Sequence, residues 1–92
     1  MIVRIATEGQ YEISEADTAE LGELDNAAVS ACEASDERAF REVFTRLLDY
    51  VRTKGTRIPE DELVGSDIIF PPPDVTLAQA SAEFTGDGLI PG

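Results

Sequence analysis

The sequence predicts an α+β fold, in which a small sheet packs against a two-helix antiparallel hairpin and a short C-terminal helix. Three observations support this prediction. Residues 1–13 carry β-branched and aromatic side chains in partial alternation, residues 14–55 carry apolar side chains at helical spacing, and residues 66–70 form a short apolar run that ends at three prolines. With 92 residues, the chain is expected to form a single domain, 1–92, around a modest core.

The opening segment, MIVRIATEGQYEI, predicts an N-terminal β-hairpin. Its strands would be Ile2–Ile5 and Gln10–Ile13, and Gly9 would supply the permissive backbone of the turn. Tyr11 and Ile13 are expected on the same face, because side chains alternate along a strand.

Two helices are expected next, and the short break between them at Ala34–Ser35 makes them antiparallel. Ser14 would cap the first helix and Ser35 the second, which would end at Lys54 and a C′ glycine, Gly55. The first apolar stripe is narrow and the second follows the i, i+3, i+4 rule closely. The stripes consist of Leu21, Leu24, Ala28, Ala31 and Cys32, and of Phe40, Val43, Phe44, Leu47, Leu48 and Val51.

The segment DIIFPPPDVTL joins an apolar run to three prolines. Ser66–Phe70 is long enough for one short third strand but not for a membrane span. Pairing should stop at Pro71, because proline cannot donate to a ladder. Thr76 and Gln79 fit a capping box at the start of a helix over 77–84. The predicted core consists of Ile2, Ile5, Leu21, Leu24, Phe40, Val43, Phe44, Leu47, Val51, Ile69 and Leu77.

The chain is strongly acidic, with 19 Asp and Glu against 7 Lys and Arg and a net charge of -12. We therefore expect no nucleic-acid partner and no direct membrane insertion or binding to anionic lipid, because such contacts need clusters of Lys and Arg. Only one base, Lys54, is a lysine. Such a composition suits a halophilic source, where salt screens self-repulsion, although many cytosolic proteins are simply acidic.

Several residue types are missing from the sequence. It has no histidine, no tryptophan and a single cysteine, Cys32, which excludes histidine-based triads, histidine-ligated zinc and an intramolecular disulfide. Cys32 lies in a helical pattern and is expected to be a buried apolar side chain rather than a reactive thiol. We expect a reducing cytoplasm as the compartment and find no signal-peptide pattern.

Carboxylates remain as the only candidate metal ligands. Asp61, Glu62, Asp67 and Asp74 would be the candidates in a carboxylate-based, metal-dependent hydrolase. They lie in segments with the pattern of exposed loops, whereas general acid catalysis needs a buried carboxyl group with a shifted pKa. No calcium-loop pattern is present. We therefore expect no catalytic residue, no metal site and no cofactor.

Six of the seven bases lie between Arg38 and Arg57. Arg38, Arg41 and Arg52 would project away from the apolar stripe of the second helix. Salt bridges at i,i+4 spacing would make this a solvated face, and the alternative is a mildly basic docking stripe for an acidic coiled coil. The expected pairs are Glu37–Arg41, Arg38–Glu42 and Glu42–Arg46.

Three segments bracket the chain: MIVRI…EGQYEI near its start, DELVGSDIIFPPPDVTL, and the terminal GLIPG. Taken together, they resemble the PspAA family of small PspA-associated proteins, which occur in archaea and actinobacteria beside phage-shock protein A genes. The resemblance implies a non-enzymatic adaptor of the envelope-stress response. Its partner would be PspA, a coiled-coil protein that remodels stressed membranes, and it would be cytoplasmic, reaching the inner face of the membrane only through PspA.

The resemblance implies no catalytic residues, and the segments that carry it, Asp67–Asp74 and Gly88–Gly92, are the first candidates for a partner interface. A structural homo-oligomer is a second interpretation, in which an edge strand near Ile68–Phe70 pairs across a two-fold axis. The hydrolase is the third. The candidate interface consists of Ile68, Phe70, Pro72, Asp74, Arg38, Arg41, Arg52, Leu89 and Ile90.

Overall fold

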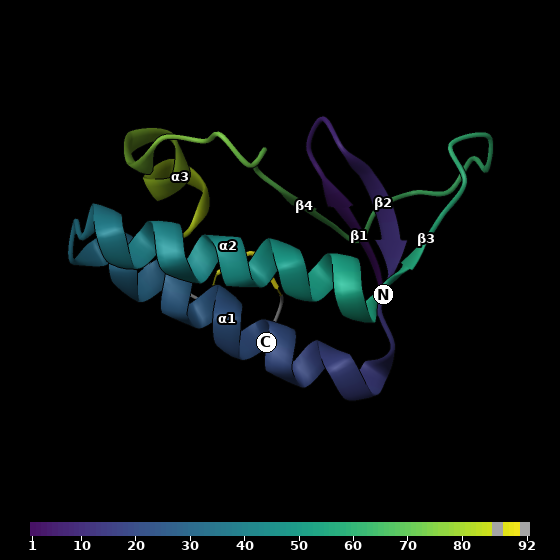
Figure 1. The fold of residues 1–92 in the computed structure, drawn as a ribbon, viewed down its shortest axis with the longest axis horizontal. Coiled ribbons are helices and arrows are strands. Elements are labelled where there is room, and N and C mark those ends of the chain that lie inside the picture. Colours follow the sequence, from purple (N-terminus) through teal and green to yellow (C-terminus); the bar gives the residue numbers. More distant parts are fainter. Residues whose placement is uncertain (86–87, 91–92) are drawn as a thin grey trace.

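A four-stranded sheet lies against two long antiparallel helices in the computed structural model, which describes residues 1–85 and 88–90 (Figure 1). The α+β class, the N-terminal hairpin, the helical hairpin and the short C-terminal helix are confirmed. The elements are β1 (Ile2–Ile5), β2 (Gly9–Glu12), α1 (Glu15–Glu33), α2 (Glu37–Lys54), β3 (Thr56–Arg57), β4 (Ile68–Phe70) and α3 (Leu77–Glu83). Within residues 1–85 and 88–90, none of the helices combines the length and the hydropathy that a membrane span requires.

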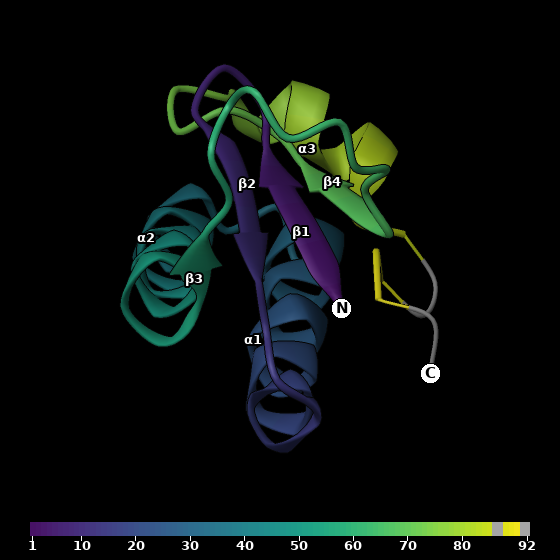
Figure 2. The same ribbon diagram turned by 90° about the vertical axis from the view of Figure 1, so that its right-hand side faces the viewer.

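The sheet is mixed and has the strand order β3-β2-β1-β4, which Figure 2 shows from one end. β1 and β2 pair antiparallel, and the turn between them uses positive φ at Thr7 (70°) as well as at Gly9 (148°). β4 pairs parallel with β1. The sequence predicts three strands and misses β3, because two residues beside a glycine carry no alternating pattern.

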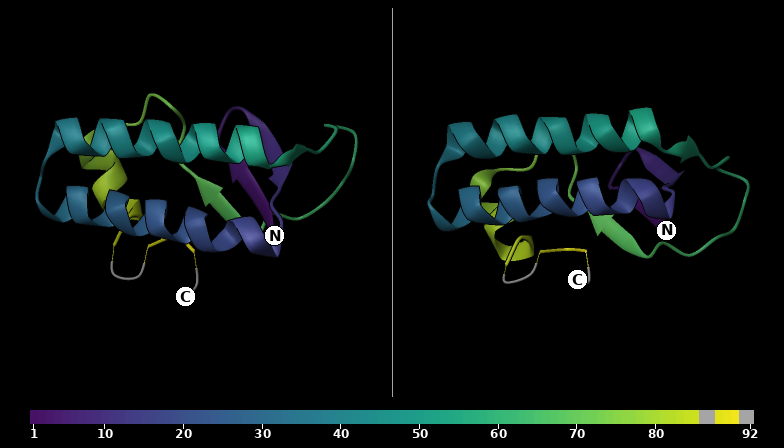
Figure 3. Two further views of the ribbon diagram at one scale, coloured as in Figure 1. Left: turned by 60° about the horizontal axis from the view of Figure 1, so that its bottom comes forward. Right: turned by 90° about the horizontal axis from the view of Figure 1, so that it is seen from below.

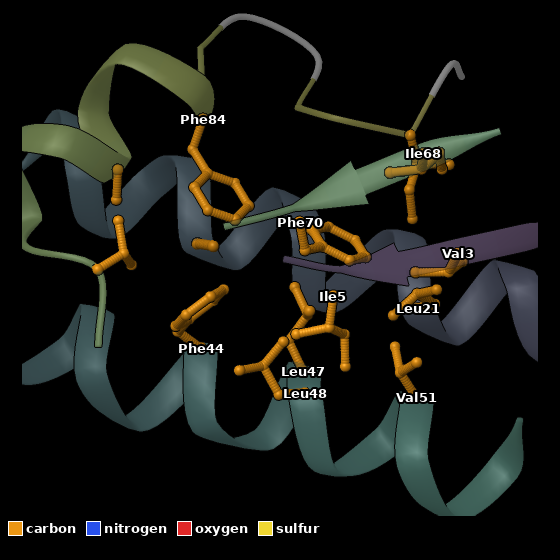
Figure 4. Close-up of a cluster of buried hydrophobic side chains, with 14 of the residues drawn as sticks. Val3, Ile5, Leu21, Phe44, Leu47, Leu48, Val51, Ile68, Phe70 and Phe84 are labelled. Atoms are coloured by element: carbon orange, nitrogen blue, oxygen red, sulfur yellow. The ribbon is translucent and has the colours of Figure 1, made fainter. Parts of the chain in front are cut away.

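Both long helices cover one face of the sheet, and Figure 3 shows them side by side in front of it. Val3 and Ile5 of β1 point toward the helices, as do Ile68 and Phe70 of β4, and all four side chains are buried. The side chains that meet them from α1, α2 and the end of α3 are Leu21, Phe44, Leu47, Leu48, Val51 and Phe84 (Figure 4).

The predicted core is confirmed in the helices and at Ile5, and is wrong by one position at Ile2 and Ile69. Ile69 is 55% exposed and Ile2 is half-buried, while their neighbours Val3, Ile68 and Phe70 are buried. Three consecutive apolar residues give no alternation, so the sequence does not show which of them faces inward. The confirmed core residues are Ile5, Leu21, Phe40, Phe44, Leu47 and Val51, and those packed half-buried against the core are Leu24, Val43 and Leu77.

The two long helices meet at a tight connection that differs from the prediction by one residue. Ser35 has a positive φ of 54° and ends α1: its N–H donates to Cys32 O and that of Asp36 to Ala31 O, both at 3.0 Å, the paired bonds of a Schellman motif. Asp36, not Ser35, then caps α2, because its carboxylate accepts a hydrogen bond from the Ala39 N–H at 3.1 Å.

The helices α1 and α3 begin at the capping residues that the sequence predicts. Ser14 caps α1, and Thr76 and Gln79 form the capping box of α3. Gly55 follows α2 as predicted, but in extended rather than left-handed backbone (φ −80°, ψ 157°). A Cβ there would lie 2.8 Å from Ile13 Cδ1, so the close approach of the hairpin accounts for this glycine.

Candidate functional site

The face of the sheet opposite the two long helices is not covered by a helix of the described residues. Along it, Gln10, Arg4 and Ile69 form one row across β2, β1 and β4, because Arg4 is paired with both neighbours. Arg4 and Ile69 are exposed, and Gln10 is covered by a loop. We call the following residues the open sheet face: Ile2, Arg4, Ala6, Gln10, Glu12 and Ile69, with Leu63 and Val64 of the covering loop.

The loop between β3 and β4 is bound over the β2 side of the open sheet face. Gln10 Nε2 donates to Val64 O at 3.0 Å and to Ser66 Oγ at 2.7 Å. The amide of a buried glutamine therefore fixes the position of this loop. In this position of the loop, Leu63 and Val64 lie at the surface and are 99% and 38% exposed.

Two hollows lie in the open sheet face, on either side of Arg4. The first, of about 500 Å³, lies on the β2 side beneath the covering loop, and the second, of about 550 Å³, lies at the end of β4 beside α3. The first is lined by residues that include Arg4, Gln10, Ile58, Glu60, Glu62, Leu63 and Val64. The second is lined by Ala6, Ile69, Phe70, Pro71, Pro72, Val75, Gln79 and Glu83.

The open sheet face combines apolar side chains with an acidic rim. Leu63, Val64 and Ile69 are the three large apolar side chains exposed in the described part of the chain, and each lines one of the hollows. Arg4 is the one base in either lining and forms no ion pair with a carboxylate of the described residues. The exposed acids on the open sheet face and in the linings of its two hollows are Glu12, Glu60, Glu62 and Glu83.

The predicted interface residues are divided between the core and the surface. Ile68, Phe70 and Ile90 are buried within the chain itself, and their side chains belong to its core. Pro72 is half-buried in the lining of the second hollow, and Asp74 is exposed. A short apolar run gives no sign of this division, because the core and a docking surface both favour apolar residues.

Arg41 binds the triple-proline segment to α2. Its guanidinium donates from Nη1 to Pro73 O at 3.1 Å and from Nη2 to Val75 O. Arg41 therefore supports the fold of the segment that lines the second hollow. The expected i,i+4 pairs of α2 are not among the ion pairs that the described residues form, since Arg41 turns toward these carbonyls and Arg38 stays exposed.

Arg52 binds the turn of the β1–β2 hairpin to α2. Its Nη2 lies 2.6 Å from Glu8 Oε1, its Nε donates to Glu8 Oε2 at 2.9 Å, and its Nη1 lies 3.0 Å from Asp49 Oδ1. The hydrogen bonds from Arg52 lower the pKa of Glu8 from its usual value of 4.5. Like Arg41, Arg52 therefore forms its hydrogen bonds within the chain.

The C-terminal tail is bound by an acid that the sequence prediction misses. Asp25 is 1% exposed, and its Oδ1 and Oδ2 accept hydrogen bonds from the N–H groups of Leu89 (3.1 Å) and Ile90 (2.9 Å). Gly88 has a φ of 86° and lies so close that a Cβ would be 2.7 Å from Asp25 Cγ. The GLIPG motif thus has a structural role as far as Ile90, and its last two residues lie outside the described ones. The one signal in the sequence is an acid within the apolar stripe of α1.

The hydrolase candidates are not gathered into a metal site. In residues 1–85 and 88–90 no group of three or more His, Cys, Asp or Glu is placed to hold a metal ion. Asp61, Glu62 and Asp74 are exposed, and Asp67 Oδ2 accepts a hydrogen bond from the Ile2 N–H at 2.7 Å. Cys32 is buried, as predicted.

Comparison with known proteins identifies the family. Residues 1–92 match the family model described as PspA-Associated protein, PspAA. No curated protein and no solved structure gave a match to the chain. The match extends over the hairpin, the triple-proline segment and the tail that carry the resemblance in the sequence, and the chain therefore belongs to the PspAA family.

Proposed function

We propose that the chain is a non-enzymatic accessory protein of the phage-shock type of envelope-stress response, and that it binds and modulates PspA. The observation that carries this proposal is the match of the whole chain to a family described as PspA-associated. An accessory protein of this kind needs a surface for its partner. The open sheet face, with three exposed apolar side chains beside two hollows, is consistent with such a surface.

The charge of the chain favours a protein partner over a lipid surface. A net charge of -12 repels anionic headgroups, so we propose that this cytoplasmic protein reaches the inner face of the membrane only through PspA. A halophilic archaeal source would fit the same charge, because high salt screens the repulsion between the acids.

Co-purification from native cells tests the proposal. A tagged copy of the chain is captured at the salt concentration of the cytoplasm, and the bound proteins are identified by mass spectrometry. We expect PspA among them, and a tagged acidic protein of similar size from the same cells serves as the control. Recovery of PspA with the control alone, or with neither bait, would contradict the proposal.

A structural homo-oligomer is a second candidate, because β4 lies at an edge of the sheet and Ile69 on it is exposed. The edge strand has only three residues, which limits the area that strand pairing alone can bury. Light scattering behind size-exclusion chromatography tests this candidate, and a strict monomer over a hundredfold range of concentration would end it.

A further inference from the structure

We propose that the open sheet face binds one amphipathic helix of the partner, laid across the strands, with apolar residues at positions i and i+7 and an acid between them. The inference rests on the proposed function for the identity of the partner, PspA. The kind of segment follows from the geometry and charge of the open sheet face itself.

The spacing of Ile69 and Gln10, which line the second and the first hollow, matches two turns of a helix. Ile69 on β4 and Gln10 on β2 lie in one row and are separated by two strand spacings, or about 10 Å. A helix rises about 1.5 Å per residue, so seven residues span this distance and bring side chains i and i+7 to the same face. One of them would lie beside Ile69 over the second hollow, and the other beside Leu63 over the first.

Arg4 lies at the middle of this row, and its charge determines which residue type the helix needs between its two apolar side chains. It is exposed and has no ion-pair partner among the described residues. A helix residue at i+3 or i+4 lies on the same side as i and i+7 and would stand above it. An Asp or Glu at that position would form a charge-assisted hydrogen bond with the guanidinium, partly shielded from water by the flanking apolar contacts.

The rim of the open sheet face determines the flanks of the helix. Around the apolar centre lie four exposed acids, so Lys or Arg on both sides of the apolar stripe would be attracted and acids there repelled. The same charges disfavour a second copy of this chain as the occupant, because it would bring a further net charge of -12 against them. The four acids are Glu12, Glu60, Glu62 and Glu83.

A helix across the strands would also cover more of the exposed apolar side chains than an added strand would. A strand paired with β4 would lie beyond the edge of the sheet and contact Ile69. It would leave Leu63 exposed, because the loop that carries Leu63 lies over β2, two strands away from β4. A helix across the strands covers both side chains and completes a third layer over the sheet.

The test uses purified PspA of the same organism and overlapping 30-residue peptides of its sequence, with binding measured by fluorescence anisotropy. We expect one peptide with the stated pattern to bind and to gain helical circular dichroism in the complex. Ile69→Asp, Leu63→Asp and Arg4→Glu should each weaken the binding of that peptide and of PspA about 30-fold or more, the effect of a central interface residue. All three side chains are exposed, so the variants should fold as the wild type does.

Arg46→Glu is the matched control, since Arg46 is an exposed arginine on α2, which packs against the opposite face of the sheet, and its reversal should leave binding unchanged. Replacing the central acid of the peptide by lysine should restore binding to Arg4→Glu and weaken binding to the wild type. If PspA binds the wild type and all three variants equally, this inference is wrong while the proposed function stands. If the bound peptide gains the circular dichroism of a strand, the inference is also overturned. The same holds if the wild type self-associates and the Ile69→Asp variant does not, because a second copy of the chain would then occupy the open sheet face. If PspA does not bind the wild type, the proposed function fails with it.

Discussion

The buried carboxylate of Asp25 in α1 accepts a hydrogen bond from the backbone N–H of Ile90, 65 residues further along the chain, at 2.9 Å. The other carboxylate oxygen accepts from Leu89, so one side chain satisfies two backbone donors of the tail. Ile90 is buried as a result, and α1 is joined to the end of the chain. This relationship gives the GLIPG motif a physical role within the described residues.

Asp25→Ala should lower the free energy of unfolding by about 2–4 kcal/mol, because it leaves two N–H groups without their charged acceptor. Urea unfolding followed by circular dichroism measures the change. Glu23→Ala, an exposed acid two residues earlier on the same helix, is the control and should change stability by less than about 0.5 kcal/mol. Equal stabilities of the two variants would show that the tail is not bound through Asp25.

Gly88→Ala should destabilise the protein by about 1 kcal/mol or more, because an alanine is strained at a φ of 86° and its Cβ would overlap the Asp25 carboxylate. Gly22→Ala should do the opposite and stabilise by about 0.5–1 kcal/mol, since Gly22 lies inside α1 with no atom near the added Cβ. Thermal unfolding of both variants checks the prediction. A stabilising Gly88→Ala would be incompatible with the described position of the tail.

The bond between Arg52 and Glu8 predicts a pH dependence. Because hydrogen bonds from Arg52 lower the pKa of folded Glu8 below 4.5, their contribution is fully present above this unfolded value and is lost as the pH falls through the folded value. The pair is partly exposed, so its contribution is at most about 1 kcal/mol. Unfolding at several pH values between 7 and 3 should show that Glu8→Gln differs from the wild type at neutral pH and converges with it in acid. A constant difference would contradict this account.

Arg41→Ala should destabilise the protein by about 1–2 kcal/mol, because the carbonyls of Pro73 and Val75 lose their charged donor. Arg38→Ala removes the same kind of side chain from an exposed position on the same helix and should have little effect. Chemical denaturation compares the two. If Arg38→Ala were as destabilising as Arg41→Ala, the hydrogen bonds to Pro73 and Val75 would not be the source of the effect.

The parts of the fold that could be predicted from sequence are those with a local cause. The apolar stripe of α2 and the capping box at Thr76 each depend on residues within a few positions of one another. The turn at Gly9 belongs to the same class, although Thr7 shares the positive φ. For these elements, side-chain period and cap chemistry both favour the structure that is observed.

The parts that could not be predicted depend on distant residues. The parallel pairing of β1 with β4 decides that Ile69 faces outward, and nothing within the run of three apolar residues contains that information. Asp25 interrupts the apolar stripe of α1, but the sequence does not show what it binds, because its partners lie at the other end of the chain. The open sheet face cannot be predicted from sequence for the same reason, since Arg4, Leu63 and Ile69 come from three separate segments.

The central claim is that this PspAA protein binds PspA directly. Mixing the purified chain with purified PspA, at a salt concentration where both are folded, and following the mixture by size-exclusion chromatography with light scattering tests it most directly. We predict that the 9.9 kDa chain elutes together with PspA in a complex of constant stoichiometry. Elution of the chain at its own volume in the presence of excess PspA, with both proteins at about 100 μM, would contradict the account.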